Sequence, residues 1–215
     1  ATVQERVKEM LATIVEGKEQ ACKDYASKLD KYEGEVVLSK ERIEKLISQV
    51  SDRDKSDVDY AIEKVRTFAL AQRASIKDFE QELEPGVFAG QKLIPMVTAG
   101  CYVPGGLYAH IASAVMTVAT AKAAGVENVI VTTPPRRDKP GEPSFEPDAL
   151  IVYAAHTCGA DTILCLGGVQ GIGALRYGLF TGKEADILVG PGNPYVATAK
   201  RMLYGECGID MFAGP

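Results

Sequence analysis

Three glycine-rich turns are the segments of this sequence with the clearest chemical use. They are Tyr102-Val-Pro-Gly-Gly, Gly167-Gly-Val-Gln and Gly190-Pro-Gly-Asn. Each follows an apolar run and precedes a helical pattern. Glycine lacks a Cβ atom, so such turns let the backbone approach a ligand closely. Their repetition in one half of the chain predicts a nucleotide-type binding cleft.

The carboxamides of Gln170 and Asn193 stand at the ends of two of these turns. A carboxamide offers both a donor and an acceptor, which suits a ribose or an amide group of a ligand. Asn193 has a second interpretation, because Asn before a helix that begins with Pro194 is a good N-cap. Neither G-x-G-x-x-G nor G-x-x-x-x-G-K-[ST] occurs, and each turn taken singly also fits an ordinary tight turn.

The histidines and cysteines do not predict a metal or nucleophile site. His110 stands close to a predicted helix start and His156 lies within a helical segment, whereas zinc needs three or four ligands. The five cysteines form no C-x-x-C pair, which is typical of reduced thiols. Cys158 and Cys165 have apolar neighbours and are expected in the core. Nothing near Cys101 would lower its thiol pKa, so no nucleophile is assigned.

Net charge and hydropathy favour a small-molecule partner. The 215 residues carry a formal net charge of -5 without a long basic run, which disfavours nucleic acid and anionic membranes as partners. No apolar run approaches the roughly 18 residues of a membrane span, and residues 1–6 lack the features of a signal peptide. We therefore expect a cytoplasmic protein.

Charge and glycine content divide the chain into two parts. Most charged residues lie in residues 1–100, and most of the 21 glycines lie in residues 101–215. The first part is expected to be mainly helical scaffold with solvated charged faces, forming part of a first domain. The second part is expected to be a separate sheet domain that contains the glycine turns.

Apolar spacing and capping residues predict the helices of the first part. Helical patterns cover residues 3–14, 18–29, 43–50 and 58–72. The first of these is expected to break near Gly17. N-caps are expected at Ser39 and at Asp52 or Asp54, because short polar side chains satisfy the first backbone N–H groups of a helix.

Helical and strand patterns alternate in the second part. Before them, residues 80–90 are expected to form a turn region that leads into an edge strand over 93–97, which contains Pro95. Strands are predicted over 128–132, 162–166 and 186–189, and helices over 111–124, 148–158, 170–177 and 194–204. Continuous apolar strands between helices are typical of an α/β fold with an open, doubly wound parallel sheet. Its glycine turns follow the strands, where such sheets bind ligands.

Eight motifs follow one another in a recognisable order along the second part. They are Tyr102-Val-Pro-Gly-Gly, Ala121-Lys-Ala-Ala-Gly-Val, Thr133-Pro-Pro, Ala154-Ala-His-Thr-Cys-Gly-Ala-Asp, Gly167-Gly-Val-Gln, Val189-Gly-Pro-Gly-Asn, Ala199-Lys-Arg and Gly208-Ile-Asp-Met-Phe-Ala-Gly-Pro. This series closely resembles the histidinol dehydrogenase family. Leu83-Glu-Pro-Gly and Gly90-Gln-Lys-Leu-Ile-Pro extend the resemblance to nearly the whole chain.

The resemblance implies an NAD-dependent dehydrogenase that oxidises a primary alcohol through an aldehyde to a carboxylate, with zinc holding the substrate hydroxyl. The residues that match the family's NAD contacts are Tyr102, Gln170 and Asn193. The cofactor domain, residues 101–215, would be an incomplete Rossmann-like unit, and the protein a homodimer. The family's zinc ligands and its Glu-His acid/base pair follow the Ala-Gly-Pro motif, so they are expected beyond Pro215. No catalytic or metal residue is therefore assigned.

Two substrates and one non-catalytic role are compatible with the resemblance. Tyr108-Ala-His-Ile-Ala-Ser and Thr120 are more similar to paralogues that oxidise 2,3-dihydroxypropane-1-sulfonate to sulfolactate than to enzymes that convert L-histidinol to L-histidine. In that case His110 would bind the sulfonate, since a protonated imidazole at a helix start favours an anion. The alternative is that His110 only begins the helix. A truncated NAD-binding module without catalysis is the third possibility.

Overall fold

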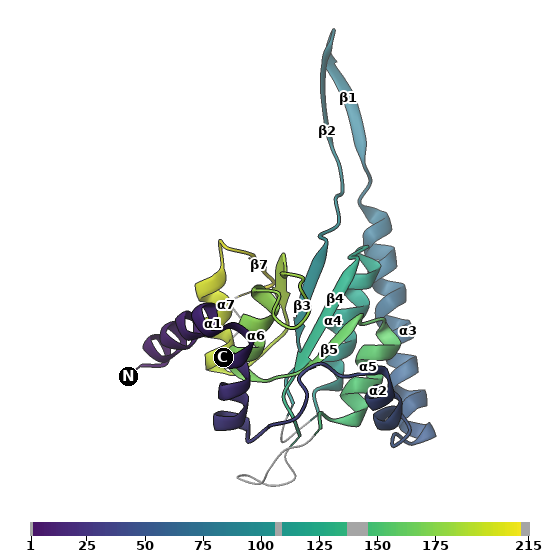
Figure 1. Cartoon of the computed structure of the whole chain (residues 1–215). Coiled ribbons are helices and arrows are strands. Elements are labelled where there is room, and N and C mark those ends of the chain that lie inside the picture. Colours follow the sequence, from purple (N-terminus) through teal and green to yellow (C-terminus); the bar gives the residue numbers. More distant parts are fainter. Residues whose placement is uncertain (1, 106–108, 137–145, 212–215) are drawn as a thin grey trace.

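The computed structural model describes residues 2–105, 109–136 and 146–211, which form helices on both faces of a parallel sheet (Figure 1). The sheet has five strands in the order β5-β4-β3-β6-β7. Its strands are β3 (Thr98–Tyr102), β4 (Asn128–Thr133), β5 (Thr162–Cys165), β6 (Ile187–Val189) and β7 (Gly208–Ile209). The expected α/β class, with N-terminal helices before a doubly wound parallel sheet, is confirmed.

Two groups of helices cover the sheet (Figure 1). In the first group, α6 (Gly168–Arg176) and α7 (Pro194–Leu203) pack against each other and against α1 (Val3–Tyr25). The second group consists of α4 (Ile111–Ala123), α5 (Ala149–Cys158), α3 (Asp52–Ser75) and α2 (Lys40–Ile47). Because both faces are covered, β4 is buried along its whole length, as its uninterrupted apolar pattern predicts.

The elements predicted in the second part are confirmed, with ends shifted by one or two residues. The short strand β7 was not expected, because two residues carry no periodic pattern. The expected boundary between residues 100 and 101 lies inside β3, and α1 from the first part packs on α6 and α7 from the second. The division into two domains stays a prediction.

Helix α1 is broken, as expected near Gly17. Lys18 has φ 50° and ψ -132°, which lie outside the helical region. A π-helical segment, η1 (Ala26–Asp30), continues the chain after α1 and ends at Lys31, whose φ is 55°. The N-terminal chain therefore changes direction twice at residues with positive φ that are not glycine. Both changes occur before the chain reaches α2.

The N-caps of α2 and α3 are both serines. Ser39 caps α2 as predicted, and its Oγ accepts a hydrogen bond from the Arg42 N–H at 3.3 Å. The prediction of Asp52 or Asp54 for α3 was wrong, because Ser51 is the cap and its Oγ accepts from the Asp54 N–H at 3.1 Å. Both aspartates lie in the first turn of α3, where a negative charge is favourable.

Residues 79–91 form a hairpin, which corrects two expectations. β1 (Phe79–Glu84) and β2 (Val87–Gln91) pair antiparallel through a tight turn in which Gly86 has φ 79°. Residues 80–90 are therefore two strands and not only a turn, since Pro85 and Gly86 suit the two positions between them. Residues 93–97 are not a strand, and the sheet begins at Thr98. The hairpin projects away from the body of the molecule (Figure 1).

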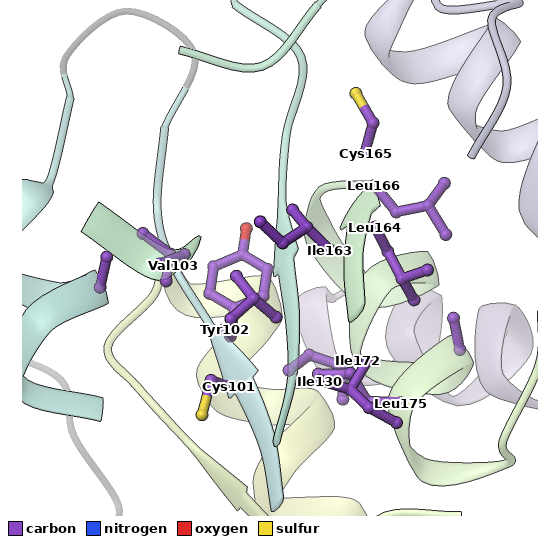
Figure 2. Close-up of a cluster of buried hydrophobic side chains, with 14 of the residues drawn as sticks. Cys101, Tyr102, Val103, Ile130, Ile163, Leu164, Cys165, Leu166, Ile172 and Leu175 are labelled. Atoms are coloured by element: carbon purple, nitrogen blue, oxygen red, sulfur yellow. The ribbon is translucent and has the colours of Figure 1, made fainter. Parts of the chain in front are cut away.

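Apolar side chains from the sheet and both helix groups form one core. Figure 2 shows part of it, with Tyr102 from β3, Ile130 from β4, Ile163 from β5, and Ile172 and Leu175 from α6. Cys101, Cys158 and Cys165 are all buried, which confirms the core positions expected for the last two. Among the described helices, none is long and apolar enough to cross a membrane.

Candidate functional site

A cavity of about 790 Å³ opens at the carboxyl edge of the sheet. Tyr102, His110, Gln170 and Asn193, the four residues singled out from the sequence, all line it. Each of the three glycine turns contributes further lining residues. Gly106, at the end of the first turn, and residues 212–215 of the last motif lie outside the described residues. The three turns, which are far apart in the sequence, thus line one cavity.

Strand order explains why they meet. From β3 the chain moves to β4 and β5 on one side, and then returns to place β6 on the other side of β3. The connections that leave β3 and β6 therefore diverge to opposite faces, which opens a crevice beyond their carboxyl ends. Open α/β sheets bind ligands at this kind of switch point.

Tyr102 is the last residue of β3 and is only 4% exposed. Its hydroxyl, which extends beyond the strand in Figure 2, accepts a hydrogen bond from the Gly168 N–H at 3.1 Å. This bond ties the end of β3 to the second glycine turn. Burial raises the pKa of Tyr102 to about 12, so the phenol keeps its proton at neutral pH. The side chain can therefore offer a donor as well as an acceptor.

Two glycines have backbone conformations that would be strained for any other residue type. Gly168 has φ 54° and begins α6, and Gly190 has φ 114° directly after β6. A Cβ atom on Gly190 would collide with the carbonyl oxygen of Tyr102. The turn at Gly190 is also stabilised by α7. The buried Lys200 Nζ donates a hydrogen bond to the Gly190 carbonyl at 2.8 Å and forms an ion pair with Asp210. The close approach of the Gly190 and Tyr102 backbones thus fixes the start of the turn whose next residues, Pro191 and Gly192, line the cavity.

Gln170 is 1% exposed and lies in the first turn of α6. Its Nε2 donates a hydrogen bond to Asp30 Oδ2 at 2.8 Å. Its Oε1 is buried and has no hydrogen-bond partner in the described part of the chain. A buried acceptor without a donor is costly in free energy, so this atom marks a place where a ligand donor would be stabilising.

Asn193 acts as the N-cap of α7. Its Oδ1 accepts hydrogen bonds from the backbone N–H groups of Tyr195 at 3.0 Å and Val196 at 3.1 Å. The capping interpretation is therefore confirmed, and Pro194 occupies the first helical position as expected. Because the cap uses the oxygen, the Nδ2 group is the part of Asn193 that can serve a ligand.

Three helices begin at the cavity wall. Their N-caps are His110 for α4, Gly167 for α6 and Asn193 for α7, and the first two have no side-chain cap hydrogen bond. Helix N-termini carry a partial positive charge and exposed N–H donors, so they attract anions. Arg6, from α1, adds a guanidinium to the same wall, and its Nη1 lies 3.4 Å from the Tyr195 hydroxyl. The cavity is therefore suited to phosphate, sulfonate or carboxylate groups.

His110 is exposed, and its binding of a sulfonate stays a prediction. It occupies the N-cap position of α4, but its side chain makes no capping hydrogen bond. It also lines the cavity, where the imidazole stands at the start of the helix. His156 is exposed on α5, within a helix as predicted, and is not among the residues that line this cavity.

Arg6 and Asp30 were missed because the N-terminal helices were expected to be scaffold with solvated charges. Both residues line the cavity. No local signal would have found Arg6, since it lies within an ordinary helical pattern. The π-helical segment that ends at Asp30 also has no signature in the sequence. Their placement depends on the packing of α1 against α6 and α7.

The described residues offer neither a metal site nor a reactive thiol at this cavity. In the ranges that the structure describes, no group of three or more His, Cys, Asp or Glu residues is arranged to hold a metal ion. Cys101 is fully buried, and burial raises the pKa of its thiol to about 12. Both observations agree with leaving Cys101 unassigned as a nucleophile, because the thiolate is the reactive form.

Comparison with known proteins gives a consistent result. The family model described as histidinol dehydrogenase matches residues 1–215. Sulfopropanediol 3-dehydrogenase of Ruegeria pomeroyi is 53% identical over 99% of this chain and 48% of that protein. A histidinol dehydrogenase homolog of Pelagibacter ubique is 55% identical over 97% of this chain and 48% of its own length. The chain thus spans about half the length of these relatives.

A solved structure with the same fold is that of histidinol dehydrogenase from Elizabethkingia anophelis. It is 30% identical to this chain and superposes with a TM-score of 0.90. The superposition covers 100% of this chain and 48% of that one. The agreement therefore extends over all of the elements described above.

Proposed function

The chain belongs to the histidinol dehydrogenase family, and on this premise we propose that it binds NAD in the cavity at the carboxyl edge and serves the oxidation of a primary alcohol to a carboxylate. The observation that carries the proposal is the buried Oε1 of Gln170, which has no hydrogen-bond partner in the described part of the chain and belongs to a side chain that lines the same cavity as the N-cap of α7. A dinucleotide offers both an anionic pyrophosphate and hydroxyl or amide donors, which are the groups that such a wall would bind.

The described residues fit this cofactor by their chemistry. The N-termini of α6 and α7 would bind the pyrophosphate through backbone N–H groups. Gln170 Oε1 would accept from a ribose hydroxyl or from the nicotinamide amide, and the protonated Tyr102 hydroxyl would donate to a ribose oxygen. Asn193 would contribute its Nδ2 group. When bound, NAD supplies the hydride acceptor that no amino-acid side chain provides.

Zinc does not fit the described residues in the same way, since they contain no suitable ligand group. We therefore assign them the binding and orientation of the cofactor and no acid, base or metal ligand. Oxidation of an alcohol to a carboxylate removes four electrons, so it would convert two NAD to two NADH and add one water at the aldehyde stage. The homodimer and the cytoplasmic location stay predictions.

We propose 2,3-dihydroxypropane-1-sulfonate as the substrate, with L-histidinol as the alternative. Two observations support the sulfonate. The relative named for sulfopropanediol is 53% identical to this chain, whereas histidinol dehydrogenase of Methanosarcina mazei is 39% and the solved histidinol dehydrogenase 30% identical. His110 also begins α4 at the cavity wall, where a helix N-terminus favours an anion and disfavours the ammonium group of histidinol.

Calorimetric titration of the full chain with NAD tests the binding, and NADH absorbance with zinc and each alcohol in turn tests the reaction. We expect NAD binding, and two NADH per molecule of the sulfonate if the preparation carries the complete reaction. Two NADH per molecule of histidinol would replace the substrate and keep the reaction. NAD binding without NADH from either alcohol would favour a non-catalytic binding module. Failure to bind NAD would contradict the proposal itself.

A further inference from the structure

We propose that Asp30 is a positioning residue that holds the Gln170 carboxamide with its oxygen toward the ligand. This inference rests on the proposed function, because it takes the cavity to be a dinucleotide site. Asp30 comes from the N-terminal helical segment and Gln170 from α6, 140 residues further along the chain. Both line the cavity, and their side chains meet there.

The chemistry of the pair selects one orientation of the amide. Gln170 Nε2 donates to Asp30 Oδ2 at 2.8 Å. An ionised carboxylate only accepts hydrogen bonds, so the amide nitrogen must face Asp30. The opposite orientation would place the amide oxygen against the carboxylate, where two acceptors repel each other. Asp30 thereby leaves Gln170 Oε1 as the buried atom without a partner in the described chain.

The backbone at Asp30 has an uncommon conformation that serves this placement. Asp30 is the last residue of the π-helical segment η1, and the next residue, Lys31, has φ 55°. A π-turn and a left-handed lysine are both unfavourable, and such strain is concentrated at functional sites. A regular continuation of α1 would point residue 30 in another direction, because the π-turn inserts an additional residue into the helix.

Contacts on the far side keep the segment in place. Tyr32 is 2% exposed, and its hydroxyl donates to the Glu35 carbonyl at 2.7 Å. The same hydroxyl accepts from Arg42 Nη2 at 3.1 Å, which links the segment to α2. The strained turn is thus anchored independently of Gln170. Asp30 is therefore presented to the cavity by the fold and is not merely drawn there by the glutamine.

The first test replaces Asp by Asn in two different Gln–Asp pairs, one in the cavity and one outside it. Asp30→Asn allows the Gln170 amide to turn, because Asn both donates and accepts. Asp24→Asn is the control, since Asp24 pairs with Gln20 on the surface of α1 at the same 2.8 Å and outside this cavity. We expect the Kd for NAD to rise about five- to tenfold in Asp30→Asn and to stay unchanged in Asp24→Asn.

A reciprocal exchange separates positioning from packing. Asp30→Asn combined with Gln170→Glu restores an amide–carboxylate pair with the same total charge, and the second Glu oxygen again presents an acceptor to the cavity. We expect this double variant to recover most of the lost affinity, whereas Gln170→Glu alone sets two carboxylates against each other and weakens binding. A role of Asp30 in folding alone would lower the unfolding temperature and show no such recovery.

Each result has a defined meaning. Unchanged NAD affinity in Asp30→Asn would overturn the positioning role while the proposed function stands. If Asp30→Asn does not fold, Gln170→Met decides, because it removes the acceptor and leaves Asp30 in place. Wild-type affinity in Gln170→Met would show that Oε1 has no part in binding and would overturn the inference. Absence of NAD binding to the unmodified chain would overturn both the proposed function and the role of Asp30.

Discussion

Two of the hollows that the described residues form are similar in size but differ in the residues that line them. The cavity at the carboxyl edge has a volume of about 790 Å³, and a second hollow along α4 and β6 has about 680 Å³. The first is lined by helix N-termini and by Gln170, whose Oε1 has no hydrogen-bond partner among the described residues. Apolar side chains such as Leu93, Ile94 and Met116 dominate the second. Size alone therefore does not identify a site, because the two hollows differ in the polar groups that their described residues offer to a ligand.

The largest effect is expected from a change directly after β6, where Gly190 precedes the cavity-lining residues Pro191 and Gly192. In Gly190→Ala the new Cβ would meet the Tyr102 carbonyl, and a residue with φ 114° would be strained as well. We expect the free energy of unfolding to fall by about 3 kcal/mol or more and NAD binding to be lost. Denaturant unfolding and calorimetry measure the two effects.

Gly182→Ala is the matched control for this change. Gly182 also has a positive φ, 69°, but nothing lies within 4 Å of its added Cβ. Only the backbone strain remains, so we expect a loss of about 1 kcal/mol and unchanged NAD affinity. Equal losses of NAD affinity in the two variants would contradict the close backbone approach as the reason for Gly190.

A smaller and more selective effect is expected at His110. His110→Ala removes an imidazole at the start of α4 and leaves the three glycine turns intact. We expect affinity for the sulfonate to fall about tenfold, since a helix N-terminus and an imidazole N–H donor act together on an anion, and NAD affinity to stay the same. Competition calorimetry with the sulfonate measures this. Unchanged sulfonate affinity would leave His110 as a helix-start residue only.

Tyr102→Phe is expected to weaken NAD binding about fivefold, because it removes the hydroxyl that meets Gly168. It should also change stability in alkali. Burial raises the pKa of Tyr102 to about 12, so between pH 10 and 12 the unfolded chain loses this proton while the folded protein keeps it. The wild type therefore loses stability as the pH rises through this window, and fully retains this contribution below pH 10.

The variant lacks this contribution, so its free energy of unfolding should fall less steeply between pH 10 and 12. The buried thiol of Cys101, with its raised pKa, acts in the same direction in both proteins and cancels in the difference. Denaturant unfolding at several pH values measures the slopes. Parallel slopes for the two proteins would contradict the burial of a protonated Tyr102.

The smallest effect is expected in the second hollow. Met116 is 62% exposed and lines that hollow, so Met116→Gln places an amide there at little cost. We expect NAD affinity to stay within about twofold of the wild type, because surface substitutions of this kind change free energies by only about 0.5 kcal/mol. A marked loss of NAD affinity would contradict the assignment of the ligand to the first cavity alone.

Much of the local structure could be predicted from the sequence. The break near Gly17, the Ser39 cap and the helix that begins at Pro194 all follow from short-range chemistry, as does the buried strand β4. The hairpin over 79–91 was missed, because exposed alternating residues around Pro85 and Gly86 fit a loop as well as two strands. The Ser51 cap was missed because the aspartates after it are equally good capping residues.

The composition of the candidate site was predictable, but its arrangement was not. Glycine, glutamine and asparagine at strand ends indicate a binding edge in any parallel sheet, and their turn conformations are set by neighbouring residues. Only the tertiary structure decided that β6 lies beside β3, which opens the crevice, and that α1 and η1 bring Asp30 against Gln170. The physical reason is that backbone torsions depend on local contacts, whereas the meeting of distant residues depends on how the apolar faces of whole elements pack.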